Sequence, residues 1–427
     1  MTTLEKNAIP SLPGPDDIYR QVLPNGITVL TRSNFNSPSV VVSGYFGAGA
    51  LFEPDDKLGL AEFTCYSLMR GTKKRTFDKI YNELESVGAS LGFSAGVHTS
   101  GFHGRSLAED LPLLLNLLSG SLVTPVFPKV EVEKLRAQLL TGLAIRAQDT
   151  SDMASMVFDA ILFKDHPYSR PEDGHPETIQ GIKRDDLVKF HRDLYGPRGM
   201  VIAIVGAVKA EEAVRHVKRA LGGWQVKGQK DALELPELKL LKKTVSKQVR
   251  IAGKSQSDMV IGTNGPRRRE PEFMAASLGN NILGQFGMMG RIGDVVREKA
   301  GLAYYAYSSL SAGTGPGSWE VSAGVNPQNV KKASGLIQDE LKRFVQEGVT
   351  EIELADSKAN YIGRLPISLE SNGGVASALL NIERHNLGLD YYRRYPILVN
   401  EVSREDVLQA ARKFIDPDRL AIAVAGP

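Results

Sequence analysis

The sequence of 427 residues contains a single cysteine, Cys65. One cysteine excludes a disulfide within the chain, which is typical of proteins from a reducing compartment. The most apolar stretches, Met200–Val208 and Leu420–Ala425, are far too short to cross a bilayer. The first 17 residues show no charged segment followed by an apolar one, as a secretory signal would have. We therefore expect a soluble cytoplasmic protein, with secretion after removal of a signal as the alternative.

The chain also lacks an excess of charge of either sign, because 52 basic residues stand against 49 acidic ones. The net charge of +3 gives no reason to expect nucleic acid or a membrane surface as a partner. A short basic run, Arg267 to Arg269, is followed by Glu270 and Pro271 and is typical of a solvated turn. Hydrophobic residues make up 42% of the chain, which is ordinary for a globular protein.

The few histidines show no spacing typical of metal ligands. His98 and His103 are five residues apart, so on a strand they point to opposite faces. Around Ser94, residues Gly92–Gly96 match the G-x-S-x-G elbow of serine hydrolases. That elbow needs a strand before it and a helix after it, whereas the following residues favour a strand. A serine hydrolase that uses Ser94 is therefore a disfavoured alternative.

An internal repeat indicates how the chain is organised. Residues 184–206 and 404–426 align without a gap at an offset of 220, with seven of 23 positions identical. Each copy predicts a helix, a proline-containing turn and a buried strand that ends in glycine. We predict a flexible N-terminal arm over 1–17, an N-terminal lobe over 18–224, a linker over 225–240 and a C-terminal lobe over 241–427. Both lobes contain strands and helices, which predicts an α+β fold in which each lobe is an α/β sandwich, a mostly antiparallel sheet with helices packed on it.

The segment Gly59–Thr72 reads G-L-A-E-F-T-C-Y-S-L-M-R-G-T. It resembles the metal-binding helix of the insulinase/pitrilysin family, the inverzincin peptidases, whose frame is G-L-A-H-F-x-E-H followed by apolar residues and K/R-G-T. In that family two histidines on one helix face hold zinc, and the glutamate between them is the general base.

At these three positions the chain has Glu62, Cys65 and Tyr66. The resemblance also implies a third ligand, a glutamate, on a helix that matches Val132–Gln148, yet no carboxylate lies between Lys134 and Gln148. Metal binding by the three substituted residues is the alternative, but tyrosine is a poor zinc ligand. We expect a degenerate site without metal.

The segment Gly290–Ser308 resembles the second signature of the family, R-E-K-x-G-L-A-Y. The resemblance places the family's Arg/Tyr pair on Arg297 and Tyr304, and implies that the guanidinium holds a peptide carbonyl while the phenol donates to the oxyanion. We expect Arg297 in the last turn of a helix, a left-handed cap at Gly301, and Tyr304 at the start of a strand. The alternative is a surface arginine beside a core tyrosine.

The segment Asn281–Gly290 is rich in glycine, with Gly284, Gly287 and Gly290 just before this signature. The resemblance implies a flexible loop that contacts substrate. A hinge between two helices is the alternative.

The resemblance implies that the chain is the non-zinc subunit of a heterodimeric metallopeptidase, inactive alone. A paralogous HxxEH subunit is the expected partner and would carry the zinc, and unfolded peptides are the expected substrates. In the family, substrates add a strand to a sheet edge in the zinc lobe. This edge would match Leu91–Thr99 here, and with a degenerate zinc site the resemblance implies a vestigial copy. The alternative is a purely structural subunit, similar to the core proteins of respiratory complexes, with no peptidase role.

Overall fold

The structure, a computed structural model, describes residues 12–287 and 289–427. The predicted arm over 1–17 therefore lies outside the described residues up to position 11. Its described part contacts the rest of the chain, because Leu12 is buried and Arg393 pairs with Asp16 at 2.5 Å. The described chain divides into two compact units. The first holds the residues up to Leu143 with Pro171–Glu234 and Pro366–Arg393, and the second holds Ala144–Arg170, Leu235–Leu365 and Arg394–Pro427.

The first unit is built on a six-stranded sheet in the order β1-β2-β6-β3-β5-β4. Only β2 and β6 pair in parallel, and the other neighbouring strands are antiparallel. The strands are β1 (Tyr19–Val22), β2 (Thr28–Ser33), β3 (Ser39–Phe46), β4 (Ser90–Ala95), β5 (Ser100–Leu107) and β6 (Val201–Gly206). The strand predicted over Leu91–Thr99 thus ends at Ala95, because the chain turns between β4 and β5.

The second unit contains a five-stranded sheet in the order β7-β11-β8-β10-β9. This order repeats β2-β6-β3-β5-β4, and β7 and β11 again form the parallel pair. The strands are β7 (Val245–Arg250), β8 (Ser257–Asn264), β9 (Ala303–Leu310), β10 (Ser318–Val325) and β11 (Ala421–Gly426). The predicted fold of two similar lobes, each a mostly antiparallel sheet with packed helices, is confirmed.

The predicted repeat is visible in the elements themselves. Helix α7 (Arg184–Leu194) and helix α15 (Arg404–Phe414) begin and end at an offset of 220, as do β6 and β11. The other helices of eight or more residues, apart from α5 and α13, are α1 (Leu60–Ser67), α2 (Phe77–Glu85), α3 (Leu111–Val123), α4 (Lys129–Arg146), α8 (Ala210–Leu221), α9 (Phe273–Gly284), α11 (Val330–Glu347), α12 (Glu351–Ser368) and α14 (Tyr391–Glu401).

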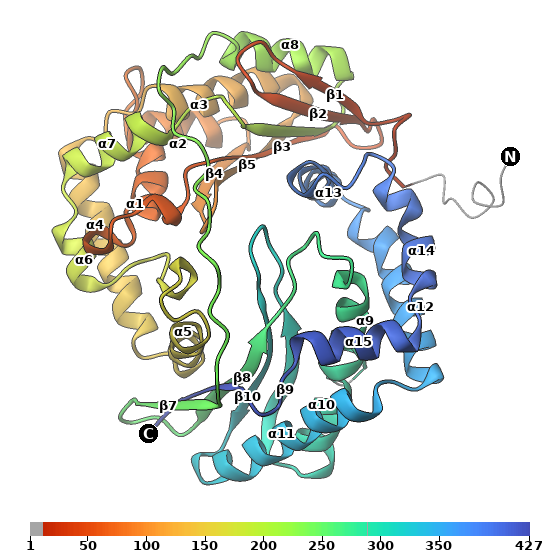
Figure 1. The fold of residues 1–427 in the computed structure, drawn as a ribbon. Helices are drawn as coiled ribbons and strands as arrows, with labels where there is room; N and C mark the ends of the chain where they lie inside the picture. The colour runs from red at the N-terminus through yellow and green to blue at the C-terminus, as the bar shows by residue number, and fades with distance from the viewer. Residues whose placement is uncertain (1–11, 288) are drawn as a thin grey trace, which may run out of the picture. The chain divides into compact units, whose positions relative to one another are not determined.

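Helices α5 (Thr150–Leu162) and α13 (Asn372–His385) are exchanged between the two halves of the sequence. Helix α5 packs on β8 and β11 of the second unit, where Phe158 lies in one core with Val260 and Ala423. Helix α13 packs on β3 and β6 of the first unit (Figure 1). The compact units therefore differ from the lobes of the repeat by one helix each, while residues 225–240 contain neither helix nor strand.

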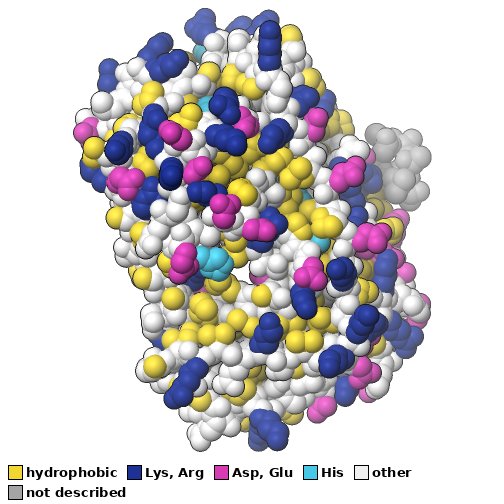
Figure 2. All heavy atoms as spheres, turned by 60° about the vertical axis from the view of Figure 1, so that its left-hand side comes forward, with side chains coloured by type: hydrophobic (Ala, Val, Ile, Leu, Met, Phe, Trp, Pro, Cys, Tyr) yellow, Lys and Arg dark blue, Asp and Glu magenta, His cyan; other side chains and the backbone are white. Residues whose placement is uncertain are grey.

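The surface carries charges of both signs. On the face drawn in Figure 2, Lys and Arg side chains are interspersed with Asp and Glu. No helix in the described part of the chain is both long and apolar enough to cross a membrane.

Candidate functional site

The helix that resembles the metal site, α1, begins after Gly59, which has the left-handed φ of +89°. Its N-terminus is capped from outside the helix. Glu53, which is buried, accepts hydrogen bonds from the backbone N–H groups of Gly59 at 3.1 Å and Ala61 at 2.6 Å. Burial raises the pKa of the Glu53 carboxyl to about 8, although these two hydrogen bonds act to lower it. The sequence reasoning missed this residue, since a carboxylate six positions before a helix cap carries no periodic signal.

The three substituted positions of α1 differ in environment. Glu62 is half-buried, Tyr66 is 39% exposed, and Cys65 is fully buried. Burial raises the pKa of the Cys65 thiol to about 12 and also raises the pKa of the Tyr66 phenol. Because Cys65 is fully buried and tyrosine is a poor zinc ligand, these donors do not fit the metal of the family. Among residues 12–287 and 289–427, no three His, Cys, Asp or Glu side chains are grouped so that they could hold a metal.

Ser94 does not lie on a nucleophile elbow. It is an exposed residue of β4, and β4 runs through a short turn into the antiparallel strand β5 rather than into a helix. His103, on β5, hydrogen bonds instead to the hydroxyl of Ser43 at 2.8 Å. The geometry therefore gives no support to the alternative of a serine hydrolase that uses Ser94.

Arg297 lies in a helical segment, Asp294–Lys299, whose winding is π rather than α. Such wide turns are rare and frequently occur at functional sites. The segment ends as predicted, because Gly301 has φ +64° and its N–H donates to the carbonyl of Arg297 at 3.1 Å. The side chain of Arg297 is about one third exposed and lies 3.6 Å from the carboxylate of Glu298.

Tyr304 is the second residue of β9, and 69% of it is exposed to solvent. Its neighbours Tyr305 and Tyr307 share the opposite face of the strand, with ring centroids 5.8 Å apart. The hydroxyl of Tyr305 donates to Asp258 at 2.5 Å. The alternative of a core tyrosine at 304 is therefore wrong: the fold leaves both this phenol and the Arg297 guanidinium partly open to solvent.

The three glycines before this signature have different roles. A Cβ on Gly284 would lie 2.1 Å from the backbone nitrogen of Ser308, and one on Gly290 would lie 2.5 Å from the carbonyl of Ile282. Gly287 has φ +61° but faces open space. The first and last glycines therefore allow close packing against neighbouring backbone, and only Gly287 lies free in the loop. Contact between this loop and a substrate stays a prediction.

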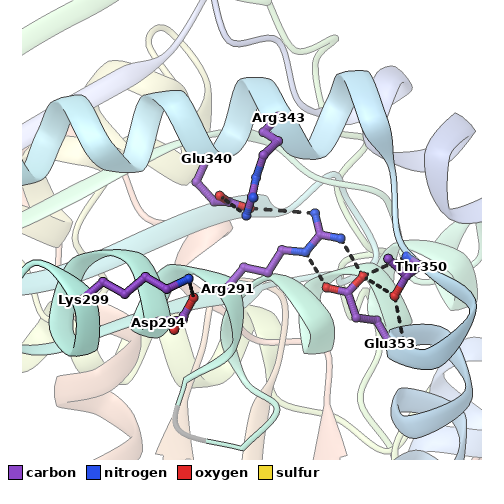
Figure 3. Close-up of polar contacts among 7 residues, drawn as sticks. All are labelled: Arg291, Asp294, Lys299, Glu340, Arg343, Thr350 and Glu353. Atoms are coloured by element: carbon purple, nitrogen blue, oxygen red, sulfur yellow. Dashed lines mark hydrogen bonds and ion pairs between the residues drawn. The ribbon is translucent and has the colours of Figure 1, made fainter.

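A charged network holds the start of this signature (Figure 3). Arg291, in the short helix α10 (Gly290–Gly293), forms two hydrogen bonds of 2.6 Å with the carboxylate of Glu353 on α12. Its guanidinium also lies 3.8 Å from Glu340 of α11, which is buried and pairs with Arg343 at 2.6 Å. Burial acts to raise the pKa of Glu353, but the bonds from Arg291 and Thr350 prevail and lower it to about 2. The segment that carries Arg297 is thus anchored to two long helices.

Comparison with known families covers most of the chain. A family model described as "Insulinase (Peptidase family M16)" matches residues 28–171, and one described as "Peptidase M16 inactive domain" matches residues 181–361. An uncharacterized zinc protease of Mycobacterium leprae is 28% identical over 418 residues, which cover 96% of this chain and 92% of that protein. A protein of Arabidopsis thaliana named "Probable mitochondrial-processing peptidase subunit beta" is 28% identical over 197 residues, 46% of this chain and 37% of that one.

Solved structures share the fold. The peptidase M16 inactive domain of Pseudomonas fluorescens superposes with a TM-score of 0.87 at 26% identity and covers 96% of this chain and 98% of that chain. A protease from Helicobacter pylori gives a TM-score of 0.89 at 18% identity, with 97% and 100% covered. The chain belongs to the insulinase family of peptidases, family M16, and lacks the active-site motif of that family.

Proposed function

We propose that the chain is the non-zinc subunit of a heterodimeric peptidase of this family and that it supplies Arg297 and Tyr304 to the reaction. The observation that carries this proposal is the exposure of Tyr304, since a phenol that is 69% exposed contributes little to packing. Arg297 lies on a π-wound turn seven residues earlier and also keeps part of its side chain in solvent. A purely structural subunit has no need for either group to be open.

The chemistry of the two side chains suits peptide hydrolysis. A guanidinium presents a planar set of donors that can hold a peptide carbonyl oxygen, and a phenol can donate to the oxyanion that forms when the carbonyl is attacked. The residues of α1 do not fit a zinc ion that could supply the attacking water, because Cys65 is fully buried and tyrosine is a poor zinc ligand. The partner would therefore be a paralogous subunit with the HxxEH motif and its zinc.

The expected substrates are unfolded peptides. Strand β4 is the last strand in its sheet, so one of its edges is unpaired within the described part of the chain. An extended peptide can add to such an edge through backbone hydrogen bonds, which give affinity with little sequence preference. In the family this edge belongs to the zinc lobe, so the corresponding edge of the partner is the expected binding site and the segment over 91–99 here is its vestigial copy.

Reconstitution tests the proposal. The chain alone should cleave no peptide, and a mixture with the HxxEH paralogue should hydrolyse an unfolded fluorogenic peptide. Tyr304→Phe and Arg297→Ala should each lower kcat by about 100-fold or more, as the removal of one oxyanion donor does elsewhere. Tyr307→Phe is the matched control, because this phenol lies on the same strand with its side chain on the other face.

Two outcomes would contradict the proposal in different ways. Full activity of both variants would show that the Arg/Tyr pair is not used. A stable complex without activity under any pairing would instead support the purely structural subunit.

A further inference from the structure

A cavity of about 470 Å³ lies within the second unit, between linker residues 237–241 and the end of strand β8. Its volume falls in the range of about 300–1,000 Å³ that is usual for ligand pockets. Leu238, Leu241 and Phe414 give it apolar walls. Leu240, also in the wall, is 62% exposed and adds apolar surface at the cavity mouth.

Two polar side chains in this cavity have an atom without a hydrogen-bond partner among the described residues. They are Thr263, only 4% exposed, through its hydroxyl, and Asn264, through its Nδ2 amide. A buried polar group without a partner costs about 1–3 kcal/mol, so such groups are rare unless a bound molecule completes them. Two residues that line the cavity therefore carry a hydroxyl and an amide donor without a partner among the described residues.

The rim carries three carboxylates, Glu237, Glu270 and Asp416, and three cations, of which two are paired. Lys413 pairs with Glu272 at 2.7 Å, and Arg419 pairs with Asp416 at 2.6 Å. The side chain of Arg267, which is exposed, makes no ion pair or hydrogen bond within the described part of the chain. An unpaired guanidinium beside an apolar cavity is suited to a carboxylate.

The linker wall has an irregular backbone. No backbone–backbone hydrogen bond within the described structure involves residues 231–243, which form neither helix nor strand. Leu238 and Leu241 nevertheless fix this segment, because both pack against the core cluster that contains Phe158 and Val260. A held segment whose backbone makes no hydrogen bonds to other backbone groups can pair with another extended chain.

We propose that this cavity binds the C-terminal end of an extended peptide. The carboxylate would pair with Arg267, an apolar side chain would contact Leu240 and Phe414, and the peptide backbone would bond to Thr263, Asn264 and the linker. A peptide has backbone carbonyl acceptors, an apolar side chain and a terminal carboxylate, which match the donors, the apolar walls and the cation of the lining. This site does not depend on the proposed peptidase role, since it lies in this chain and is tested without a partner.

The experiment is fluorescence anisotropy with the purified full chain and a fluorescein-labelled hexapeptide, Ala-Ala-Gly-Ala-Ala-Leu. The form with a free C-terminus should bind saturably and at least tenfold more tightly than the amidated form. Arg267→Gln should remove that difference, whereas Arg269→Gln should preserve it, because Arg269 belongs to the same basic run but does not line the cavity.

A second variant separates binding from folding. Thr263→Val keeps the shape of the side chain and removes a hydroxyl without a partner, so the melting temperature should not fall. Binding of the hexapeptide should weaken by about twofold to tenfold, the effect of one lost hydrogen bond. The proposal is overturned if no saturable binding occurs up to about 1 mM peptide, or if Arg267→Gln leaves the preference for a free C-terminus intact. Decanoate, an apolar carboxylate without a peptide backbone, serves as the comparison ligand. The proposal is also overturned if decanoate binds as tightly as the hexapeptide and if Thr263→Val weakens the binding of both ligands equally.

Discussion

The buried carboxylate of Glu53 accepts a hydrogen bond of 2.6 Å from the backbone N–H of Ala61, in the first turn of the degenerate metal helix. A helix N-terminus carries unsatisfied N–H groups, and Glu53 satisfies two of them from a separate segment. This helix therefore has a capped N-terminus although it lacks the metal ligands of the family.

Glu53 predicts a dependence of stability on pH. Its carboxyl has a pKa of about 8 in the folded protein and an ordinary value near 4.5 in the unfolded chain. Between these values the folded state binds more protons, so the free energy of unfolding should fall as pH rises from about 5 to 9, by at most about 1.4 kcal/mol per pH unit. Urea unfolding at several pH values measures this slope. Glu53→Gln should flatten it, and an unchanged slope in that variant would assign the effect to another group.

The Arg291 network predicts a large cost on mutation. Arg291→Met would leave the buried Glu340 and the part-buried Glu353 without their shared cation, which should destabilise the protein by about 3 kcal/mol. Lys299→Met is the control, since its ion pair with Asp294 is exposed and contributes less than about 1 kcal/mol. Denaturant unfolding of both variants checks the difference. Equal effects would mean that the network does not anchor this segment.

The same network predicts acid sensitivity. The pKa of Glu353 is lowered to about 2, below its ordinary value of 4.5. A lowered carboxyl pKa stabilises the folded state above the unfolded value, and this contribution is lost as pH falls from about 4.5 towards 2. Thermal melts between pH 6 and 3 should show this loss in the parent protein. In Glu353→Gln the decline over the same window should be smaller.

The glycines near the Arg/Tyr signature form a matched pair. Both Gly287 and Gly290 have φ close to +60°, so alanine at either position should cost about 1 kcal/mol of backbone strain. At Gly290 the added Cβ would also lie 2.5 Å from the Ile282 carbonyl, so Gly290→Ala should cost clearly more. Thermal melts of the two variants measure the difference, and similar melting temperatures would show that the loop relaxes freely.

Cys65 predicts an inert thiol. Because it is fully buried with a pKa of about 12, a thiol reagent at pH 8 should label the native chain hardly at all and should label the unfolded chain fully. Rapid labelling of native protein would show that the thiol is accessible at the surface.

The α1 helix also predicts that the chain binds no zinc. After dialysis against zinc, metal analysis should find well below one ion per chain, as the donors of α1 do not fit zinc.

The sequence predicted the repeat to the residue, because α7 with β6 and α15 with β11 share one pattern of apolar spacing. The position of Tyr304 on a strand also followed from the pattern around it. The π winding around Arg297 was not predictable, since it shifts hydrogen bonds without changing which residues are apolar. The Glu53 cap and the exchange of α5 and α13 depend on contacts between distant segments, and local periodicity contains no information about them.

The exchange of α5 and α13 also bears on how the protein is made. The sheet of the first unit is complete once β6 has been synthesised, yet α13, which covers β3 and β6, is translated roughly 170 residues later. An emerging N-terminal half on the ribosome would therefore expose an apolar sheet surface for many seconds at ordinary translation rates. We expect a chaperone to bind this intermediate through its exposed apolar surface. If the gene is split within residues 225–240, the two halves of the protein should fold only when both are present.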